Sequence, residues 1–443
     1  MAKNQIDQLV YQAVFDKDKT KKKEARYKIW QQAVSSGIIL SSINDFYLAR
    51  GKEEIKKIFT VPAINIRGMA YNTARAAFKA AKDLNVGAMI FEIARSEMVY
   101  TDQSPNEYVT VISAAAIKEE WSGPLFIQGD HYQAKNKAPG QPKQGEIKVI
   151  KALIKQSVDA GFYNIDIDMS TLVDLNKSDV VVQQEPNAKY SAILTEWTRS
   201  LEPKGMSISI GGEIGHIGGK NSTIEDFTAY IDQYNKLLPS GMVGMSKISV
   251  QTGTHHGGVV LPDGSLADVN VDFSILSDIS KVGRKKYQIG GAVQHGASTL
   301  PDKFFAQFVK SEAIEVHLAT GFQNIIMDHA QFPKDLLQTI YDWLKKEKID
   351  EKKSDQTEEQ FFYSLRKKAW GQFKKESWNI SEERQEQIRQ SLIKRFKFMF
   401  TQLNVGNTQE LISKYVKTVV VEKKLNDFEI QGKTNADVKG LSD

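Results

Sequence analysis

Histidines and carboxylates in the middle of the sequence are the residues best suited to do chemistry. All seven histidines lie between His131 and His329. Nine polar side chains of this region stand at or just beyond short apolar runs: Asp130, His131, Asp168, Glu213, His216, His255, His256, His295 and His317. Three neutral imidazoles on a rigid rim are suitable ligands for a catalytic zinc-like ion that keeps an open position. Carboxylates beside them can orient ligands, hold a second ion or move protons. The competing interpretation is that these groups only cap strand ends.

Glycine and hydroxyl residues gather beside the same positions. The stretch from Gly211 to Gly219 reads Gly-Gly-Glu-Ile-Gly-His-Ile-Gly-Gly and follows an apolar run, 206–210. Glycine weakens regular elements but lets a backbone approach a bulky polar group closely. Further glycines and hydroxyls at 257–258, 296–299 and 320–321 offer donors of the kind that phosphate needs. The stretch is not a dinucleotide fingerprint, because the spacing and the following helix are missing.

The elements that must position these residues alternate along the chain. Eight short apolar runs occupy residues 59–66, 88–93, 125–128, 164–167, 206–210, 247–250, 287–293 and 314–318. Stretches with helical periodicity separate most of them, at 71–84, 146–160, 188–201, 224–238 and 301–311. This alternation predicts an α/β fold, a parallel (β/α)8 TIM barrel, with a doubly wound open sheet as the alternative. In such a barrel the C-terminal strand ends form one rim, so the polar residues above are expected to converge.

The flanking segments differ in character from the middle. Residues 1–57 are predicted to form an N-terminal helical segment, residues 58–348 the barrel, and residues 349–443 a helical C-terminal extension with a polar tail. The extension is expected to pack on the barrel or on a neighbouring subunit.

Composition excludes several functional classes. The 443 residues carry a net charge of only +5, with 41% hydrophobic and 26% charged residues, which argues against a nucleic-acid partner. The absence of cysteine removes disulfides and thiolate ligands and fits a cytoplasmic protein. No secretory signal is visible, and no apolar run approaches the ~20 residues of a membrane span, so no membrane partner is expected.

A series of motifs resembles the class II, metal-dependent fructose-bisphosphate aldolases. The motifs follow the family's order over about residues 58 to 330. They are Val61-Pro-Ala-Ile-Asn65, Gly129-Asp-His131, Asp166-Ile-Asp-Met-Ser170, Glu213-Ile-Gly-His-Ile-Gly-Gly219, His256-Gly257, His295-Gly-Ala-Ser298 and Ala319-Thr320. The loop that begins at Glu213 matches most closely, and the set is more specific than any single motif.

The resemblance implies a role for each matching residue. His131, His256 and His295 would bind the metal, and Asp130 would exchange a proton with the oxygen that becomes the aldehyde. Asp168 and Glu213 would support these ligands or provide an alternative metal position. The residues implied in substrate and phosphate binding are Gly219, Gly257, Ser298, Thr299, His317 and Thr320.

The same resemblance implies a cofactor, a substrate and an assembly. The cofactor would be a divalent metal, with Zn²⁺ as first candidate and a monovalent cation as an addition. The substrate would be a small phosphorylated sugar. Fructose 1,6-bisphosphate, cleaved to dihydroxyacetone phosphate and glyceraldehyde 3-phosphate, is the first candidate. The chain would form a homodimer or homotetramer.

Several positions depart from the family's pattern. The Tyr-Lys that usually follows the second His-Gly motif is absent, and His317 stands where the family has a substrate-contacting Asn. Either His317 alters the pocket and the choice of aldehyde, or it points into the barrel and packs there. No carboxylate directly follows Gly219, and Glu225 or Asp226 is the candidate substitute.

Two other functions compete with an aldolase. One is a non-catalytic aldolase-like subunit that supports a tagatose-bisphosphate-type enzyme, although a scaffold would not need Asp130 and three ligand histidines. The other is a metal hydrolase, which would usually carry a His-x-His pair on its first strand. Residues 61–66 lack this pair.

Overall fold

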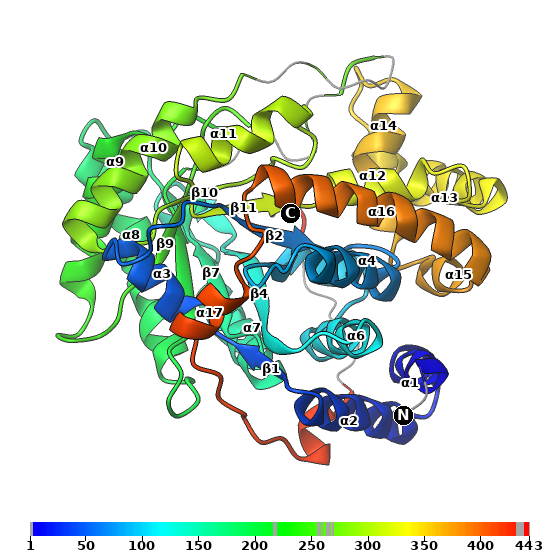
Figure 1. Cartoon of the computed structure of the whole chain (residues 1–443). Coiled ribbons are helices and arrows are strands. Elements are labelled where there is room, and N and C mark those ends of the chain that lie inside the picture. The colour runs from blue at the N-terminus through cyan, green and yellow to red at the C-terminus, as the bar shows by residue number, and fades with distance from the viewer. Residues whose placement is uncertain are drawn as a thin grey trace.

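The computed structural model describes residues 3–215, 219–254, 258, 260–262, 267, 270–430 and 438–442. Eight parallel strands form a closed barrel, in which the pairing of β4 with β7 completes the ring (Figure 1). In ring order the strands are β2 (Val61–Asn65), β3 (Ile90–Ala94), β4 (Gly123–Gln133), β7 (Asn164–Asp168), β8 (Ser209–Glu213), β9 (Lys247–Val250), β10 (Ala292–Gln294) and β11 (Glu315–Leu318). Each predicted apolar run overlaps one of these strands, so the predicted barrel is confirmed.

Helices between the strands cover the outside of the barrel. They are α4 (Ala70–Asp83), α5 (Arg95–Tyr100), α6 (Pro105–Lys118), α7 (Glu146–Ala160), α8 (Val180–Arg199), α9 (Ile224–Leu237), α10 (Phe273–Val282), α11 (Phe305–Lys310) and α12 (Thr320–Met327). Helix α7 illustrates why they form, since its buried Ile150, Ile154 and Val158 recur at helical spacing. A short hairpin of β5 (Asn136–Ala138) and β6 (Gln141–Pro142) precedes α7.

The N-terminal segment is only partly helical, which corrects the prediction for residues 1–57. Helices α1 (Lys3–Phe15) and α2 (Lys19–Ser35) precede a strand, β1 (Ile38–Ser41), which pairs in parallel with β4. The prediction missed β1 because its residues follow closely on α2 and were assigned with it to one helical segment. Helix α3 (Asn44–Gly51) follows, and its Tyr47 hydroxyl reaches a carboxylate in the barrel interior.

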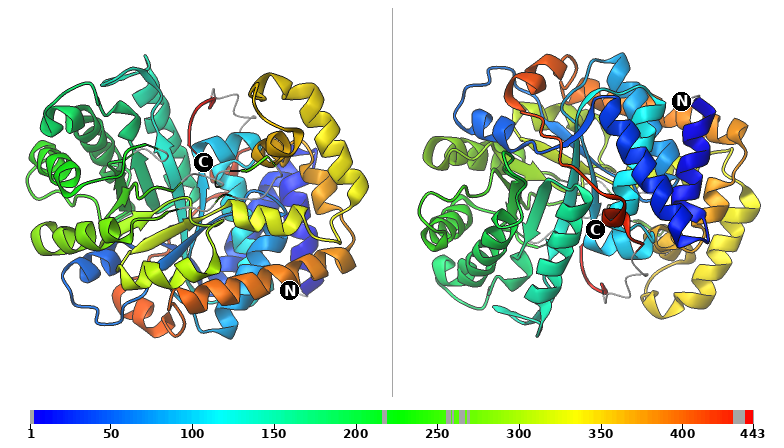
Figure 2. Two further views of the ribbon diagram at one scale, coloured as in Figure 1. Left: turned by 90° about the horizontal axis from the view of Figure 1, so that it is seen from above. Right: turned by 90° about the horizontal axis from the view of Figure 1, so that it is seen from below.

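The C-terminal extension packs on the barrel. It contains α13 (Lys334–Glu347), α14 (Glu358–Leu365), α15 (Lys374–Trp378), α16 (Glu382–Gln402) and α17 (Gln409–Tyr415). Helix α16 packs against α4 and α12 (Figure 1). The ring centroids of Phe322 on α12 and Phe396 on α16 are 4.6 Å apart. Figure 2 shows the N-terminal helices and the extension on the same side of the barrel. Among the described helices, none has the length and apolar character needed to cross a bilayer.

Charged side chains fill the centre of the barrel, where branched apolar residues usually pack. We call Glu92, Gln128, Asp166, Lys247 and Glu315 the inner polar layer. The Lys247 ammonium contacts Glu315, Asp166 at 3.0 Å and the Gln128 Oε1 atom at 2.7 Å. Gln128 Nε2 donates to Glu92 at 2.7 Å and to Glu315 at 2.9 Å. All five side chains are almost fully buried, so each depends on its neighbours for hydrogen bonds.

Replacing Tyr47 with phenylalanine tests the support that α3 gives to this layer. Tyr47 is fully buried and donates to Glu315, so Tyr47→Phe removes a hydrogen bond to a buried carboxylate. We expect the free energy of unfolding to fall by about 1.5–3 kcal/mol in urea denaturation. Tyr11→Phe is the control, because the Tyr11 hydroxyl bonds to Asn379 at the surface and its loss should change the stability by under about 0.5 kcal/mol. Equal effects of the two variants would contradict the assigned support.

Candidate functional site

A β-bulge in β4 places two consecutive polar residues at the mouth of the barrel. The register between β4 and β7 shifts between Gly129 and Tyr132, and His131 has a φ of 42°. Successive side chains of a regular strand point to opposite faces, whereas a bulge re-aims one of them. Asp130 and His131 are therefore both within reach of the same cluster of histidines and carboxylates. A left-handed φ is strained for histidine, and such strain tends to persist at functional sites.

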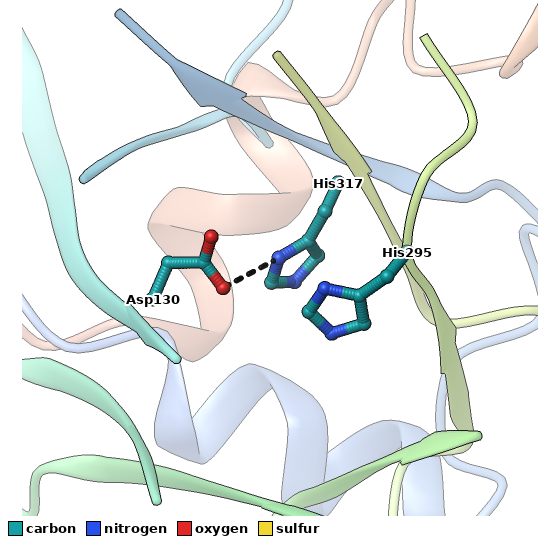
Figure 3. A group of neighbouring side chains, drawn as sticks. All are labelled: Asp130, His295 and His317. Atoms are coloured by element: carbon teal, nitrogen blue, oxygen red, sulfur yellow. Dashed lines mark hydrogen bonds and ion pairs between the residues drawn. The ribbon is translucent and has the colours of Figure 1, made fainter. Parts of the chain in front are cut away.

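Three imidazoles converge across the C-terminal end of the barrel. His131 on β4 and the residue after β10, His295, belong to strands on opposite sides of the ring, yet their ring centroids are 4.2 Å apart. The rings of His295 and His317, on β11, are 4.0 Å apart (Figure 3). All three are nearly fully buried. The predicted convergence of these residues on one rim is therefore present in the structure.

Two carboxylates hold one face of His131. Its Nδ1 atom lies 3.0 Å from Asp168 Oδ2 and 3.1 Å from Glu213 Oε2. Asp168 ends β7 and also accepts hydrogen bonds from the backbone N–H and hydroxyl of Ser170 at 3.0 and 2.7 Å, and from Gln133 Nε2 at 2.6 Å. This fixes the carboxylate, which in turn orients the imidazole. Asp168 and Glu213 thus both contact His131 directly.

Asp130 lies between an imidazole and an amide. Its Oδ1 atom is 3.1 Å from His317 Nδ1 (Figure 3). Its Oδ2 atom accepts from Asn65 Nδ2 at 2.9 Å. His317 Nε2 lies 2.6 Å from Glu315 in the inner polar layer. Of the two orientations that the sequence leaves open for His317, the structure has the inward one. There the ring contacts Asp130 instead of only packing.

Burial and neighbouring charges shift the pKa values of these groups. Burial acts to lower the pKa of His131, but the carboxylates of Asp130 and Glu213 outweigh it and raise that pKa well above its usual range. Burial acts to raise the pKa of Asp130, but the charges of His131 and His317 hold it well below its usual range. Burial, aided by Asp168, raises the pKa of Glu213 to about 8. A cation that binds His131 must therefore compete with a proton that these carboxylates favour.

The donor set fits a divalent cation. One ligand atom each from His131, Glu213 and His295 lie within 4.8 Å of one another, and so do ligand atoms of Asp130, His295 and His317. Two imidazoles with a carboxylate are a ligand set of catalytic zinc sites, and these groups need small movements to close around an ion. His295 Nε2 lies 2.9 Å from the Ser249 hydroxyl. The ring is thus held at the edge of the cluster.

Three of the predicted phosphate-binding residues, Ser298, Thr299 and Thr320, lie on two neighbouring loops. Ser298 and Thr299 follow β10, and Thr320 begins α12 after β11. The Gly321 N–H donates to the Ser298 hydroxyl at 3.2 Å, which joins the two loops. A Cβ atom at Gly321 would lie 2.5 Å from the Ser298 carbonyl oxygen, so only glycine fits there. Ser298 and Thr299 are half-buried at this rim.

The glycine-rich stretch serves packing at its start. A Cβ atom at Gly211 would lie 2.3 Å from Asp166 Oδ1, so this glycine makes room for the inner polar layer. Gly219 is exposed in the loop after β8. His256 and Gly257 lie outside the described residues, as do His216 and His255.

Three residues of the site were given no role in the sequence prediction. Asn65 and Ser249 touch Asp130 and His295 as described above. Arg67 follows β2, donates to Glu97 at 2.6 Å and to the Thr320 hydroxyl at 3.0 Å, and is nearly buried. Their position at or near strand ends could have indicated that they belong to the site. Asp226 is not a loop carboxylate facing the site, because it forms the N-terminal capping box of α9 with Thr223.

Comparisons with known proteins agree with this geometry. The family model "Fructose-bisphosphate aldolase class-II" matches residues 52–393. None of the curated proteins matches the chain. A probable tagatose 6 phosphate kinase from Sinorhizobium meliloti is 13% identical, with a TM-score of 0.52 over 80% of this chain and 99% of that one. A fructuronate-tagaturonate epimerase from Cohnella laeviribosi is 9% identical, with a TM-score of 0.54 over 79% and 82%. These two likenesses show the barrel fold alone.

The raised pKa of His131 predicts how metal affinity depends on pH. A proton and a metal ion compete for the imidazole lone pair, so binding must release the proton that Asp130 and Glu213 retain on His131. We expect Co²⁺ affinity to rise roughly tenfold per pH unit for each proton released, and to keep rising above about pH 6.5, where a free histidine is already neutral. Absorption titrations with Co²⁺ between about pH 6 and 8.5 measure this. An affinity that levels off at about pH 6.5 would contradict the assignment.

Proposed function

Because the chain belongs to the class II fructose-bisphosphate aldolase family, we propose that it catalyses the metal-dependent, reversible aldol cleavage of a ketose phosphate. One observation carries the proposal. A buried aspartate, Asp130, lies beside the imidazoles of His131, His295 and His317 at the C-terminal end of the barrel. This is the end at which TIM-barrel enzymes carry their active sites. A proton-transfer group next to a cation site is the pair that retro-aldol cleavage requires.

The metal would be held by His131 and His295 with His256 as the third ligand, and Zn²⁺ is the first candidate. Such a cation, when bound, supplies the Lewis acidity that stabilises the negative charge left on the donor fragment after cleavage. Asp168 and Glu213 keep the Nδ1 face of His131 occupied and leave its Nε2 atom for the cation. A monovalent cation remains part of the proposal as an additional ion.

Asp130 would move the proton. The neighbouring charges hold its pKa low, so Asp130 is ionised, which is the form that a base for the substrate hydroxyl must have. Asn65 and His317 hold its two oxygens from opposite sides, which fixes its direction. His317 therefore orients Asp130, and this role does not determine which aldehyde the enzyme uses.

The substrate class rests on the phosphate-binding candidates. Fructose 1,6-bisphosphate is the first candidate, with dihydroxyacetone phosphate as the donor product and glyceraldehyde 3-phosphate as the aldehyde. Ser298, Thr299 and the N-terminal end of α12 at Thr320 offer donors for one phosphate, and the Arg67 guanidinium lies beside Thr320. Gly219 and Gly257 would contribute backbone donors. The chain is expected to work in the cytoplasm as a homodimer or homotetramer.

The second candidate function is a non-catalytic subunit of a tagatose-bisphosphate-type aldolase. The missing Tyr-Lys after Gly257 favours it, whereas the buried acid beside the histidines favours catalysis. Activity of the purified chain alone separates the two.

Metal removal is the direct test of the proposed function. The purified chain should contain close to one divalent ion, cleave fructose 1,6-bisphosphate, lose activity to a chelator and recover it with Zn²⁺. His131→Ala and His295→Ala should lose metal and activity together. His329→Ala is the matched control, since its ring bonds to Ser391 away from the cluster and should matter little. Full metal occupancy in His131→Ala or His295→Ala would remove that residue from the ligand set.

Asp130→Asn separates proton transfer from metal binding. An amide keeps the hydrogen-bonding shape but cannot exchange a proton at neutral pH, so we expect metal content to persist while turnover falls about 10²–10⁴-fold. Turnover at saturating substrate and metal analysis of the same sample measure this. An unchanged turnover would place the acid–base group elsewhere.

A further inference from the structure

A short segment near the C-terminal end of the sequence, residues 438–442, reaches the catalytic end of the barrel. Figure 2 shows the C-terminus between the green barrel helices and the yellow helices of the extension. Residues 438–441 line a cavity of about 1090 Å³, and Lys439 and Gly440 are exposed. At Ser442 this segment makes polar contacts with the barrel.

Ser442 is held by two buried side chains from the rim. Its backbone N–H donates to Gln133 Oε1 at 2.9 Å, and its hydroxyl accepts from Gln133 Nε2 at 3.1 Å. Its carbonyl oxygen accepts from the Ser96 hydroxyl at 2.8 Å. Gln133 is 0% exposed and Ser96 is 4% exposed. The two side chains thus bind the backbone of Ser442 at the ends of β3 and β4.

The same glutamine contacts the candidate metal centre. Gln133 Nε2 also donates to Asp168 Oδ2 at 2.6 Å, and that oxygen lies 3.0 Å from His131 Nδ1. Only Gln133 and Asp168 separate Ser442 from His131. No role in the proposed reaction accounts for this contact.

We propose that the backbone of residue 442 positions the metal ligand His131. An amide side chain can present either its oxygen or its nitrogen to Asp168. The Ser442 N–H requires that Gln133 turn its Oε1 atom toward residues 438–442. This leaves the Gln133 Nε2 atom to donate to the Asp168 carboxylate. The reversed amide would set two oxygens against each other. Residues 438–442 thereby fix the orientation of the Asp168 carboxylate. Asp168 in turn keeps its contact with the Nδ1 atom of His131, so that the Nε2 atom is directed to the cation.

This inference rests on the proposed function, because it assumes that His131 binds a cation. Its readout is metal affinity, so that it does not depend on the substrate. Partners beyond the direct ligands typically contribute 10- to 100-fold in metal affinity. For a contact acting through Gln133, we expect the lower end of that range.

The experiment compares Co²⁺ affinity, by absorption titration, in the full chain and in a chain that ends at Leu441. We expect about tenfold weaker binding without Ser442, with an unchanged circular dichroism spectrum. Ser442→Ala is the matched control, since it keeps the backbone N–H and C=O that hold Gln133 and Ser96. Its affinity should stay within about twofold of the full chain.

A double-mutant cycle tests whether the effect passes through Gln133. Gln133→Leu should weaken Co²⁺ binding by itself, and shortening that variant should cause no further loss. An equal further loss would overturn the proposed route, and equal affinity of the full and shortened chains would overturn the role of Ser442. A full chain that binds no Co²⁺ would overturn both the proposed function and this inference. Intact metal binding that is insensitive to the tail would overturn the inference alone.

Discussion

The ammonium of Lys247, buried at the centre of the barrel, is the charge on which the rest of the site depends. It faces Glu315, Asp166 and Gln128, and its exposed fraction is 1%. Removing one partner of such a buried pair leaves an uncompensated charge and typically costs about 3–5 kcal/mol. Burial acts to raise the pKa of Glu315, but Lys247, His317 and Gln128 together outweigh it and lower that pKa to about 2. Glu315 is therefore a permanent anion at the floor of the candidate site.

That anion determines what lies above it. His317 contacts Glu315 through Nε2 and Asp130 through Nδ1, so its ring connects the inner polar layer to the proton-transfer candidate. The raised pKa of His317, which the carboxylates of Glu92 and Asp130 maintain against burial, lets the ring donate to both sides. The Tyr47 hydroxyl donates a further hydrogen bond to the Glu315 carboxylate. The N-terminal segment, the inner polar layer and the catalytic rim thus form one chain of hydrogen bonds through the barrel.

The sequence predicts the barrel well, because strands and helices leave a periodic signal in apolar residues. It also predicts that Asp130, His131, Asp168, Glu213, His295 and His317 meet, because parallel strands in a closed ring end at one rim. It does not predict β1, which follows closely on a helix and pairs with the distant β4, or the reach of Tyr47 into the interior. These depend on contacts between segments far apart in the chain. The orientation of His317 was equally open, since side chains alternate along a strand and a shift by one residue reverses every direction.

The β4 bulge shows most clearly why local pattern is not enough. Asp130 and His131 are neighbours, so a regular strand would send one of them to the outside of the barrel. The structure places both at the cluster through a left-handed φ of 42° at His131, a conformation for which histidine has little preference. The contacts that hold it there come from Asp168 on β7, Glu213 on β8 and His295 just after β10. The strained backbone and the candidate metal ligand are therefore one feature. The interactions that orient the imidazole for a cation also stabilise the backbone conformation that delivers it.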